Sequence, residues 1–318
     1  MKFDFGMLCQ GSGAGTVVCK GEIGYDGGEF PQVNPRRRRS ERMKLEGTVA
    51  VVTGASRGIG RVVARRCAAE GAKVALVARS AGELELVRKA ICEEGRAALD
   101  LPADVTREHE LSAALGKVRD QWGEIDLLVN VAGRLDSIGP AWEADPESWW
   151  QDVTVNILGT FRACREVLPP MIERGRGRII NFAGGGAQGP FTHASGYGCA
   201  KAAVTRFTET LAEEIGEDGP KVFALSPGFV KTEMTEQFLE SEQGRRWMRS
   251  LAERLASGDH VPPGQAAQIV ADLAGGSYDA LHGRYIHAGK DYGRLAELAQ
   301  EAAGEDAGDL RRLRISGA

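Results

Sequence analysis

Short apolar runs alternate with longer amphipathic segments from about residue 44 to residue 290, and this alternation restricts the fold more than any other feature of the chain. The runs are rich in Val, Ile and Leu, which is typical of parallel strands buried on both faces. The sequence therefore predicts a doubly wound, Rossmann-type α/β sandwich in which helices flank a seven-stranded parallel sheet on both faces. The expected strands are 48–54, 73–79, 97–105, 125–133, 177–183, 221–228 and 283–289.

The remaining segments divide around this domain. We expect one catalytic domain at 44–293, with long helices at about 146–173 and 195–217. Residues 1–43 hold glycine-rich and arginine-rich stretches with little periodicity, so they are predicted to form a disordered N-terminal extension. The C-terminal tail, 294–318, has leucines at helical spacing, which indicates a terminal helix.

The composition argues against several classes of function. The net charge of −4 gives no reason to expect a nucleic-acid partner, and no apolar run approaches the roughly 18 residues that span a bilayer. The six cysteines and five histidines are scattered without the spacing of a metal site, so no metal is expected. The lack of a C-x-x-C pair favours reduced thiols and a cytoplasmic location.

A glycine-rich loop, TGASRGIG, joins the first predicted strand to the first predicted helix. Its first glycine permits a tight turn, and the later two let the backbone approach a pyrophosphate and the helix pack on the strand. The helix N-terminus would supply N–H groups and a positive dipole to the phosphates. The predicted cofactor-binding residues of the loop are Gly54, Ser56, Arg57, Gly58, Ile59 and Gly60.

The end of the second predicted strand bears on the choice between NAD and NADP. A carboxylate there would bind the ribose hydroxyls and reject a 2′-phosphate. The chain has Ala78 at this point, followed by Arg79, and Arg57 lies in the glycine loop. Because guanidinium groups bind phosphate through charge-assisted hydrogen bonds, these residues favour NADP(H).

Tyr197 and Lys201 lie four residues apart in YGCAK and would share one face of a helix. The ordinary pKa of tyrosine, near 10, is too high for easy proton transfer at neutral pH. A neighbouring ammonium and the nicotinamide cation favour the phenolate, so we expect them to lower the pKa of Tyr197 and suit this phenol to acid/base catalysis. An isolated pair at this spacing would be a helix surface pair, but the glycine-rich loop before it favours the catalytic interpretation.

Five motifs occur in order along the chain: TGASRGIG, NVAG, TVNILGTF, YGCAK and SPGFVKT. Together they resemble the short-chain dehydrogenase/reductase family, of the single-domain, NADP-preferring kind, over about residues 44–290. The resemblance implies that Asp104 contacts the adenine, that Asn156 supports a water chain to Lys201, and that residues 227–232 hold the nicotinamide. It implies cofactor contacts by Asp104, Val105, Asn130, Ala132, Gly133, Tyr197, Lys201, Pro227, Gly228, Val230 and Thr232.

The resemblance fails at one catalytic position. The family has a serine about thirteen residues before the tyrosine, and the chain has Gly184 there. The loss of one donor to a developing oxyanion costs ~10²–10³ in rate, so catalysis would be weakened rather than abolished. Ser195 is a candidate substitute, although the N-cap of the tyrosine-bearing helix is its favoured role. Other candidates are Gln188, Thr192, His193 and the backbone N–H groups of Gly185 and Gly186.

The expected function is that of an NADP(H)-dependent oxidoreductase that interconverts a carbonyl and an alcohol, with Tyr197 as the acid/base. Two alternatives stay open: a nucleotide-binding protein that lost turnover with its serine, and an isomerase or dehydratase. The small-molecule substrate would lie among the loops 134–143 and 185–193 and an amphipathic lid helix within about 229–262. From the resemblance we expect a homodimer or homotetramer.

Overall fold

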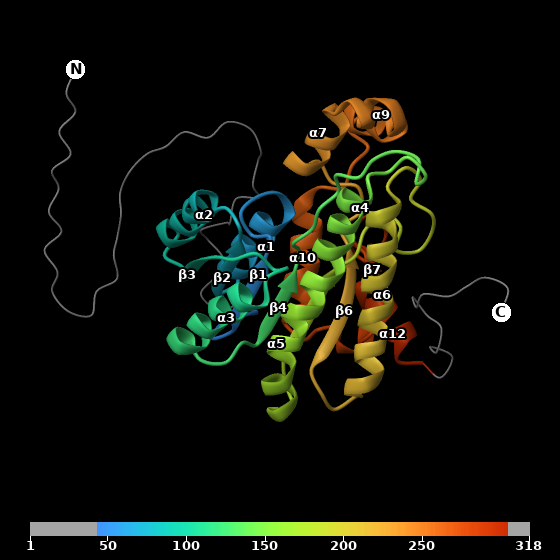
Figure 1. The fold of residues 1–318 in the computed structure, drawn as a ribbon. Coiled ribbons are helices and arrows are strands. Elements are labelled where there is room, and N and C mark those ends of the chain that lie inside the picture. Colours follow the sequence, from blue (N-terminus) through green and yellow to red (C-terminus); the bar gives the residue numbers. More distant parts are fainter. Residues whose placement is uncertain (1–42, 305–318) are drawn as a thin grey trace, which may run out of the picture.

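The computed structural model describes residues 43–304, so the N-terminal extension and the residues from 305 onward, including Leu310 and Leu313, lie outside the described part. Seven parallel strands form one sheet in the order β3-β2-β1-β4-β5-β6-β7 (Figure 1). The predicted doubly wound fold is confirmed. The strands are β1 Val49–Thr53, β2 Lys73–Ala78, β3 Ala98–Pro102, β4 Leu127–Asn130, β5 Arg178–Phe182, β6 Lys221–Ser226 and β7 Tyr285–His287.

Helices cover both faces of the sheet because successive residues of each strand point to opposite sides. In β1, Ala50 and Val52 belong to one buried cluster, whereas Val49 and Val51 belong to the other. The first cluster includes α1 Gly58–Ala69, α2 Ala81–Glu93, α10 Pro263–Ala274 and α12 Leu295–Ala302. The second includes α3 Glu108–Trp122, α5 Gly159–Glu173 and α6 Ser195–Ile215.

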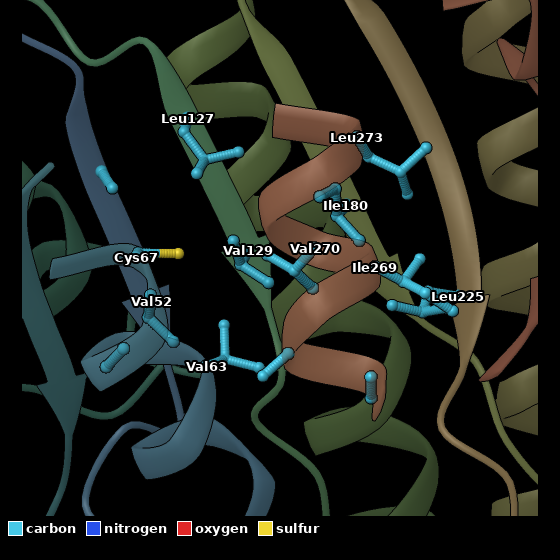
Figure 2. Packing of buried hydrophobic residues seen from close by; sticks show 14 of the residues in the cluster. Val52, Val63, Cys67, Leu127, Val129, Ile180, Leu225, Ile269, Val270 and Leu273 are labelled. Carbon is cyan, nitrogen blue, oxygen red and sulfur yellow. The ribbon is translucent and has the colours of Figure 1, made fainter. Parts of the chain in front are cut away.

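Helix α10 shows how tightly the first face is packed. Its residues Val270 and Leu273 lie against the sheet, close to Val129, Ile180 and Leu225 of three neighbouring strands (Figure 2). Each of these side chains is essentially removed from solvent. Burial of a Val or Leu side chain stabilises a fold by about 1.5–3 kcal/mol, so this contact fixes the sheet on which the site is built.

The predicted helix at 146–173 is continuous but not uniform. It begins as α4 Pro146–Val153, passes through a π-helical turn at Thr154–Leu158 and continues as α5. Asp145 caps its start by accepting a hydrogen bond from the Ser148 N–H at 2.8 Å. π-Helical turns occur frequently at functional sites, and this one carries Asn156.

The single amphipathic lid helix predicted after β6 is wrong, because the segment forms three short helices. These are α7 Glu233–Glu240, α8 Glu242–Trp247 and α9 Arg249–Ala256, which lie beyond the carboxyl ends of the strands (Figure 1). Ser241 ends α7 in extended conformation and caps α8 by accepting a hydrogen bond from the Gly244 N–H. A serine with both roles breaks the helix despite the helical spacing of the apolar residues.

Candidate active site

The glycine-rich loop lies where the strand order reverses, between β1 and β4. Gly54 has a φ of +68° and packs on the segment that follows β4, since a Cβ there would lie 2.8 Å from the Cα of Ala132. A Cβ on Gly60 would lie only 2.1 Å from the Gly54 carbonyl oxygen. Only glycine permits this close approach of α1 to β1. The topological switch point and the half-buried start of α1 fit a dinucleotide pyrophosphate.

Thr53 ties this loop to the NVAG motif, a role that the sequence reasoning missed. Its Oγ1 accepts hydrogen bonds from the backbone N–H groups of Val131 and Ala132, at 3.1 and 3.2 Å. Thr53 also pairs with Asn130 in the sheet register. The carboxyl ends of β1 and β4 are thereby fixed relative to each other, which holds Asn130, Ala132 and Gly133 beside the predicted cofactor site.

Arg79 and Asp104 lie near each other at the end of β2 and the turn after β3. Burial disfavours the charge on Asp104, but hydrogen bonds from Thr106 and the charge of Arg79 lower its pKa overall. Arg57 and Arg79 are both exposed, Arg57 in the glycine loop and Arg79 directly after β2. The predicted arginines are thus free to reach a phosphate, and the predicted adenine contact lies beside one of them.

A carboxylate lies over the glycine loop, which the sequence reasoning also missed. Glu233, the first residue of α7, pairs with Arg61 of α1 at 3.0 Å. Its other carboxylate oxygen lies 3.5 Å from the point that a Cβ on Gly58 would occupy. The ion pair therefore joins the lid to the loop at the predicted pyrophosphate position. No local sequence signal reveals this contact, because the two residues lie far apart in the chain.

The segment after β6 faces the same loop. Pro227 and Val230 are buried, and Gly228 has a φ of +77°, with a Cβ there lying 3.2 Å from the His287 ring. Thr232 caps α7 by accepting a hydrogen bond from the Thr235 N–H, and its side chain approaches Gly58. Of the residues predicted to hold the nicotinamide, Thr232 thus lies against the glycine loop.

Tyr197 and Lys201 lie one turn apart on α6, with Nζ 5.5 Å from the centre of the tyrosine ring. The Lys201 ammonium donates to the Phe182 carbonyl oxygen at 2.8 Å, and burial lowers its pKa to about 7. Burial raises the pKa of Tyr197, with further contributions from Tyr285 and Asp152. Among the protein's own residues burial therefore outweighs the Lys201 ammonium, so the expected lowering by the ammonium is wrong, and the lowering expected from the nicotinamide cation stays a prediction. Tyr197 stays protonated at neutral pH.

Gly184 lies directly against the Tyr197 hydroxyl. A Cβ at this position would be 2.6 Å from the hydroxyl oxygen and 3.5 Å from the adjoining ring carbon. The space that a serine side chain would need is thus partly filled by the tyrosine. The next residues form a turn in which the Ala187 N–H donates to the Gly184 carbonyl oxygen at 3.1 Å.

Ser195 does not cap the tyrosine-bearing helix, so that prediction is wrong. Ala194 is the N-cap of α6, and Ser195 is its first residue. The Ser195 hydroxyl accepts a hydrogen bond from the Trp149 indole N–H at 3.0 Å. Because two residues correspond to about 200° around a helix, Ser195 faces α4 while Tyr197 faces the other side. This orientation argues against Ser195 as a substitute donor.

Asn156 and Lys201 meet at Gly133. A Cβ on Gly133 would lie 2.9 Å from Oδ1 of Asn156 and 3.9 Å from Nζ of Lys201. The Asn156 amide donates to the carbonyl oxygens of Arg134 and Asp152 at 2.6 and 2.8 Å. Within the described residues its Oδ1 is buried without a partner. A buried acceptor beside the lysine suits the predicted support of a water chain.

Asp152 is a fully buried carboxylate that the sequence reasoning overlooked. It accepts hydrogen bonds from the N–H groups of Asp136 and Ser137 and pairs with Arg134 at 3.2 Å. Burial raises its pKa, although these partners oppose the rise. The carboxylate therefore anchors the start of the predicted substrate loop to α4. It lies in a stretch of otherwise mixed polarity, where no motif marks it.

The wall above Tyr197 is apolar. Tyr197 and Phe191 pack with residues of the loop after β4 and of the lid, and their ring centres are 5.9 Å apart. His193, with a φ of +64°, stacks on Trp247 of α8 at 4.7 Å and so links the loop 185–193 to the lid. The other members of this apolar cluster include Leu135, Ile138, Phe229, Met234, Phe238 and Met248.

Comparison with known proteins agrees with this geometry. A family model described as short chain dehydrogenase matches residues 48–243. A short chain dehydrogenase of Pseudocercospora fijiensis is 32% identical over 300 residues, which cover 92% of this chain and 93% of the relative. A 3-oxoacyl-(acyl-carrier-protein) reductase of Vibrio cholerae is 33% identical over 247 residues, or 77% of this chain and 97% of the relative.

Solved structures give the same result. An actinorhodin polyketide ketoreductase variant, solved with NADPH, superposes with a TM-score of 0.69 and 34% identity, over 78% of this chain and 97% of the other. A levodione reductase superposes with a TM-score of 0.71 and 29% identity, over 79% of this chain and 99% of the other. None of the helices between residues 43 and 304 has the length and hydropathy of a membrane-spanning segment.

Proposed function

The chain belongs to the short-chain dehydrogenase family of oxidoreductases, which use NAD(H) or NADP(H). We propose that it is an NADP(H)-dependent ketoreductase with an atypical active site. The observation that carries the proposal is the position of the Tyr197 and Lys201 pair at the same edge of the sheet as the glycine loop.

The proposed chemistry divides the work among these residues. When bound, NADPH supplies the hydride that adds to the carbonyl carbon and is itself oxidised. Tyr197 gives its proton to the carbonyl oxygen, which leaves an alcohol and a phenolate. The raised pKa of Tyr197 keeps the phenol protonated for this step at neutral pH. The Lys201 ammonium stabilises the phenolate, and Asn156 supports its reprotonation through water.

The preference for NADP rests on charge. Arg57 and Arg79 are exposed beside the loop, and the described residues offer no carboxylate at the end of β2 in the place of Ala78. The ketoreductase relative solved with NADPH supports the same choice. We expect Gly54, Ser56, Gly58, Ile59 and Gly60 to hold the pyrophosphate, and Val105 to pack beside the adenosine.

The substrate is proposed to be a largely apolar ketone. Phe191 and Phe229, which pack with Tyr197 against the apolar cluster and are only half-buried, offer apolar contact area beside the tyrosine. The names of two relatives, a polyketide ketoreductase and a 3-oxoacyl reductase, are consistent with a carbonyl substrate.

We also propose a homo-oligomer in the cytoplasm that forms through the long helices. Trp150 of α4 and Phe161 and Ile172 of α5 are exposed large apolar residues, at 59%, 42% and 54%. Such residues on one helical rod are suited to a second copy of the chain.

The test is NADPH oxidation with a panel of cyclic and aryl ketones, followed optically, for the wild type and for Tyr197→Phe. The proposal predicts turnover that the variant abolishes. The rival function, a nucleotide-binding protein without turnover, predicts NADPH binding with no reaction on any ketone. An isomerase or dehydratase would form product with no change in the redox state of the cofactor.

A further inference from the structure

The site lacks the family's serine, so another donor must hold the substrate oxygen if the chain is a ketoreductase. The side chains nearby are poorly placed for this role. Ser195 faces α4, and His193 is stacked on Trp247. Gln188 and Thr192 are exposed on the outer part of the loop. The backbone of the loop itself remains.

We infer that the backbone N–H of Gly185 takes the place of the serine hydroxyl and donates a hydrogen bond to the substrate carbonyl oxygen. This inference rests on the proposed ketoreductase function. It adds a catalytic group to the site without adding a proton-transfer step, since the amide keeps its proton and Tyr197 still supplies the one that is transferred.

The turn after β5 determines where this N–H points. The Gly184 carbonyl oxygen accepts a hydrogen bond from Ala187, so it faces the inside of the turn. In a trans peptide the N–H points opposite to the carbonyl oxygen, and the Gly185 N–H therefore faces outward. Among residues 43–304 it meets no acceptor, and Gly185 is solvent-exposed.

Distance also favours Gly185. The Gly184 Cβ position lies 2.6 Å from the Tyr197 hydroxyl oxygen. Bond lengths and angles place the next backbone nitrogen roughly 3 Å from that position, so the two donors are at most about 6 Å apart. A carbonyl oxygen that accepts two hydrogen bonds of about 2.9 Å needs donors about 5 Å apart, which lies within this upper bound.

The neighbouring glycine is a poorer candidate. A Cβ on Gly186 would lie 2.3 Å from the Cα of Gly198, so this residue is pressed against α6. Gly185 instead approaches the Phe191 ring, which also packs on Tyr197. Gly185 therefore borders the apolar wall of the substrate site, whereas Gly186 is directed at the helix.

The turn geometry supplies a matched pair of variants. The φ of +89° at Gly186, the third residue of the turn, is that of a type II turn, which favours proline at the second residue. Gly185→Pro removes the N–H while keeping the turn, and Gly185→Ala keeps the N–H. Both add a Cβ at the same point, 3.2 Å from the Phe191 ring, so this contact is matched, and the two variants differ in the N–H and in the ring atoms Cγ and Cδ that replace it.

The experiment compares kcat for 1-tetralone, a bicyclic aryl ketone, among the wild type and the two variants, with NADPH affinity measured by fluorescence. We expect Gly185→Pro to lose ~10²–10³ in kcat relative to Gly185→Ala, at unchanged NADPH affinity. Equal kcat values for the two variants would overturn the inference while leaving the ketoreductase proposal intact. A wild type that reduces no ketone would overturn both.

A crystal structure of the wild type with NADP⁺ and 1-tetralone gives a readout independent of rate, and serves also if the proline variant does not fold. The expected distance from the ketone oxygen to the Gly185 nitrogen is about 3 Å. A ketone oxygen bound to Tyr197 but beyond hydrogen-bond reach of this nitrogen would contradict the inference.

Discussion

The Tyr197 hydroxyl oxygen lies 2.6 Å from the point that a Cβ atom at Gly184 would occupy, so the tyrosine fills part of the space that a larger residue would need. Any side chain at this position must displace the hydroxyl that we propose as the proton donor. The missing serine is thus coupled to the placement of the tyrosine, and the two positions cannot be varied independently.

Gly184→Ala tests this coupling. The added methyl group pushes the Tyr197 hydroxyl out of place, and misplacement by about 1 Å can cost ~10²-fold in rate. We expect kcat on ketones to fall by ~10- to 100-fold with little change in NADPH affinity. The kcat of Gly184→Ser should fall less than that of Gly184→Ala, because the serine hydroxyl can donate a hydrogen bond to the substrate oxygen. An alanine variant as active as the wild type would show that the contact has no catalytic importance.

Arg79→Ala tests the cofactor preference. If Arg79 binds the 2′-phosphate, its loss removes a charge-assisted hydrogen bond of about 1.5–3 kcal/mol, or ~10- to 100-fold in kcat/KM for NADPH but not NADH. Arg88→Ala is the control, since Arg88 pairs with Asp100 on the neighbouring strand. An unchanged ratio of NADPH to NADH use in Arg79→Ala would refute the assignment.

Glu233→Gln tests the ion pair over the glycine loop. The carboxylate lies near Gly58, where the pyrophosphate is proposed to bind, so the like charge opposes binding. We expect the variant to bind NADPH a few-fold more tightly, with an effect that shrinks as salt is added. Glu236→Gln, on the same helix but paired with Lys231, should leave the affinity unchanged. Weaker binding by Glu233→Gln would mean that the ion pair preorganises the site.

Asp152→Asn tests the electrostatic link to the tyrosine. The Asp152 charge contributes to the raised pKa of Tyr197, so its removal should lower that pKa. Alcohol oxidation requires the phenolate, so the rising limb of its pH–rate profile should move to lower pH in Asp152→Asn. Asp136→Asn also removes a partner of Arg134, but the Asp136 charge does not contribute to the raised pKa of Tyr197. The rising limb of the pH–rate profile should therefore stay in place in this control variant. A purely structural role for Asp152 would change the rate without moving the limb.

The sequence predicts this fold well because each strand is a local run of apolar residues, and the runs are separated by helical patterns. The roles of Gly54 and Gly60 can be predicted for the same reason, since both glycines act within one loop. The features that were missed depend on contacts across the fold. The Glu233 ion pair, the burial of Asp152 and the rotation of Ser195 toward Trp149 join segments that no local pattern connects.

The pKa of Tyr197 illustrates the same limit in energetic terms. The spacing of Tyr197 and Lys201 correctly predicts that they share a helix face. The ammonium of Lys201 beside the phenol, taken alone, favours a lowered pKa of Tyr197. The direction reverses because Tyr197 packs against Phe191 and the lid, so that desolvation outweighs the neighbouring charge. Burial of this kind is a property of the assembled layers, not of the YGCAK motif.

Lys201→Met tests the cost of burying the lysine. The pKa of Lys201 falls from its ordinary 10.5 to about 7 on folding, so between these values the unfolded chain binds the proton more tightly. The stability that the wild type gains from this group is therefore present above pH 10.5 and lost as pH falls through 7. The variant lacks this dependence, although it leaves the Phe182 carbonyl oxygen without its donor at every pH.

We expect the unfolding free energy of Lys201→Met, relative to wild type, to be highest near pH 7 and to decline toward pH 10 in denaturant titrations. Lys290 is exposed, so Lys290→Met should show no such trend. If the unfolding free energies of Lys201→Met and the wild type change with pH in the same way, the lowered pKa of Lys201 is contradicted.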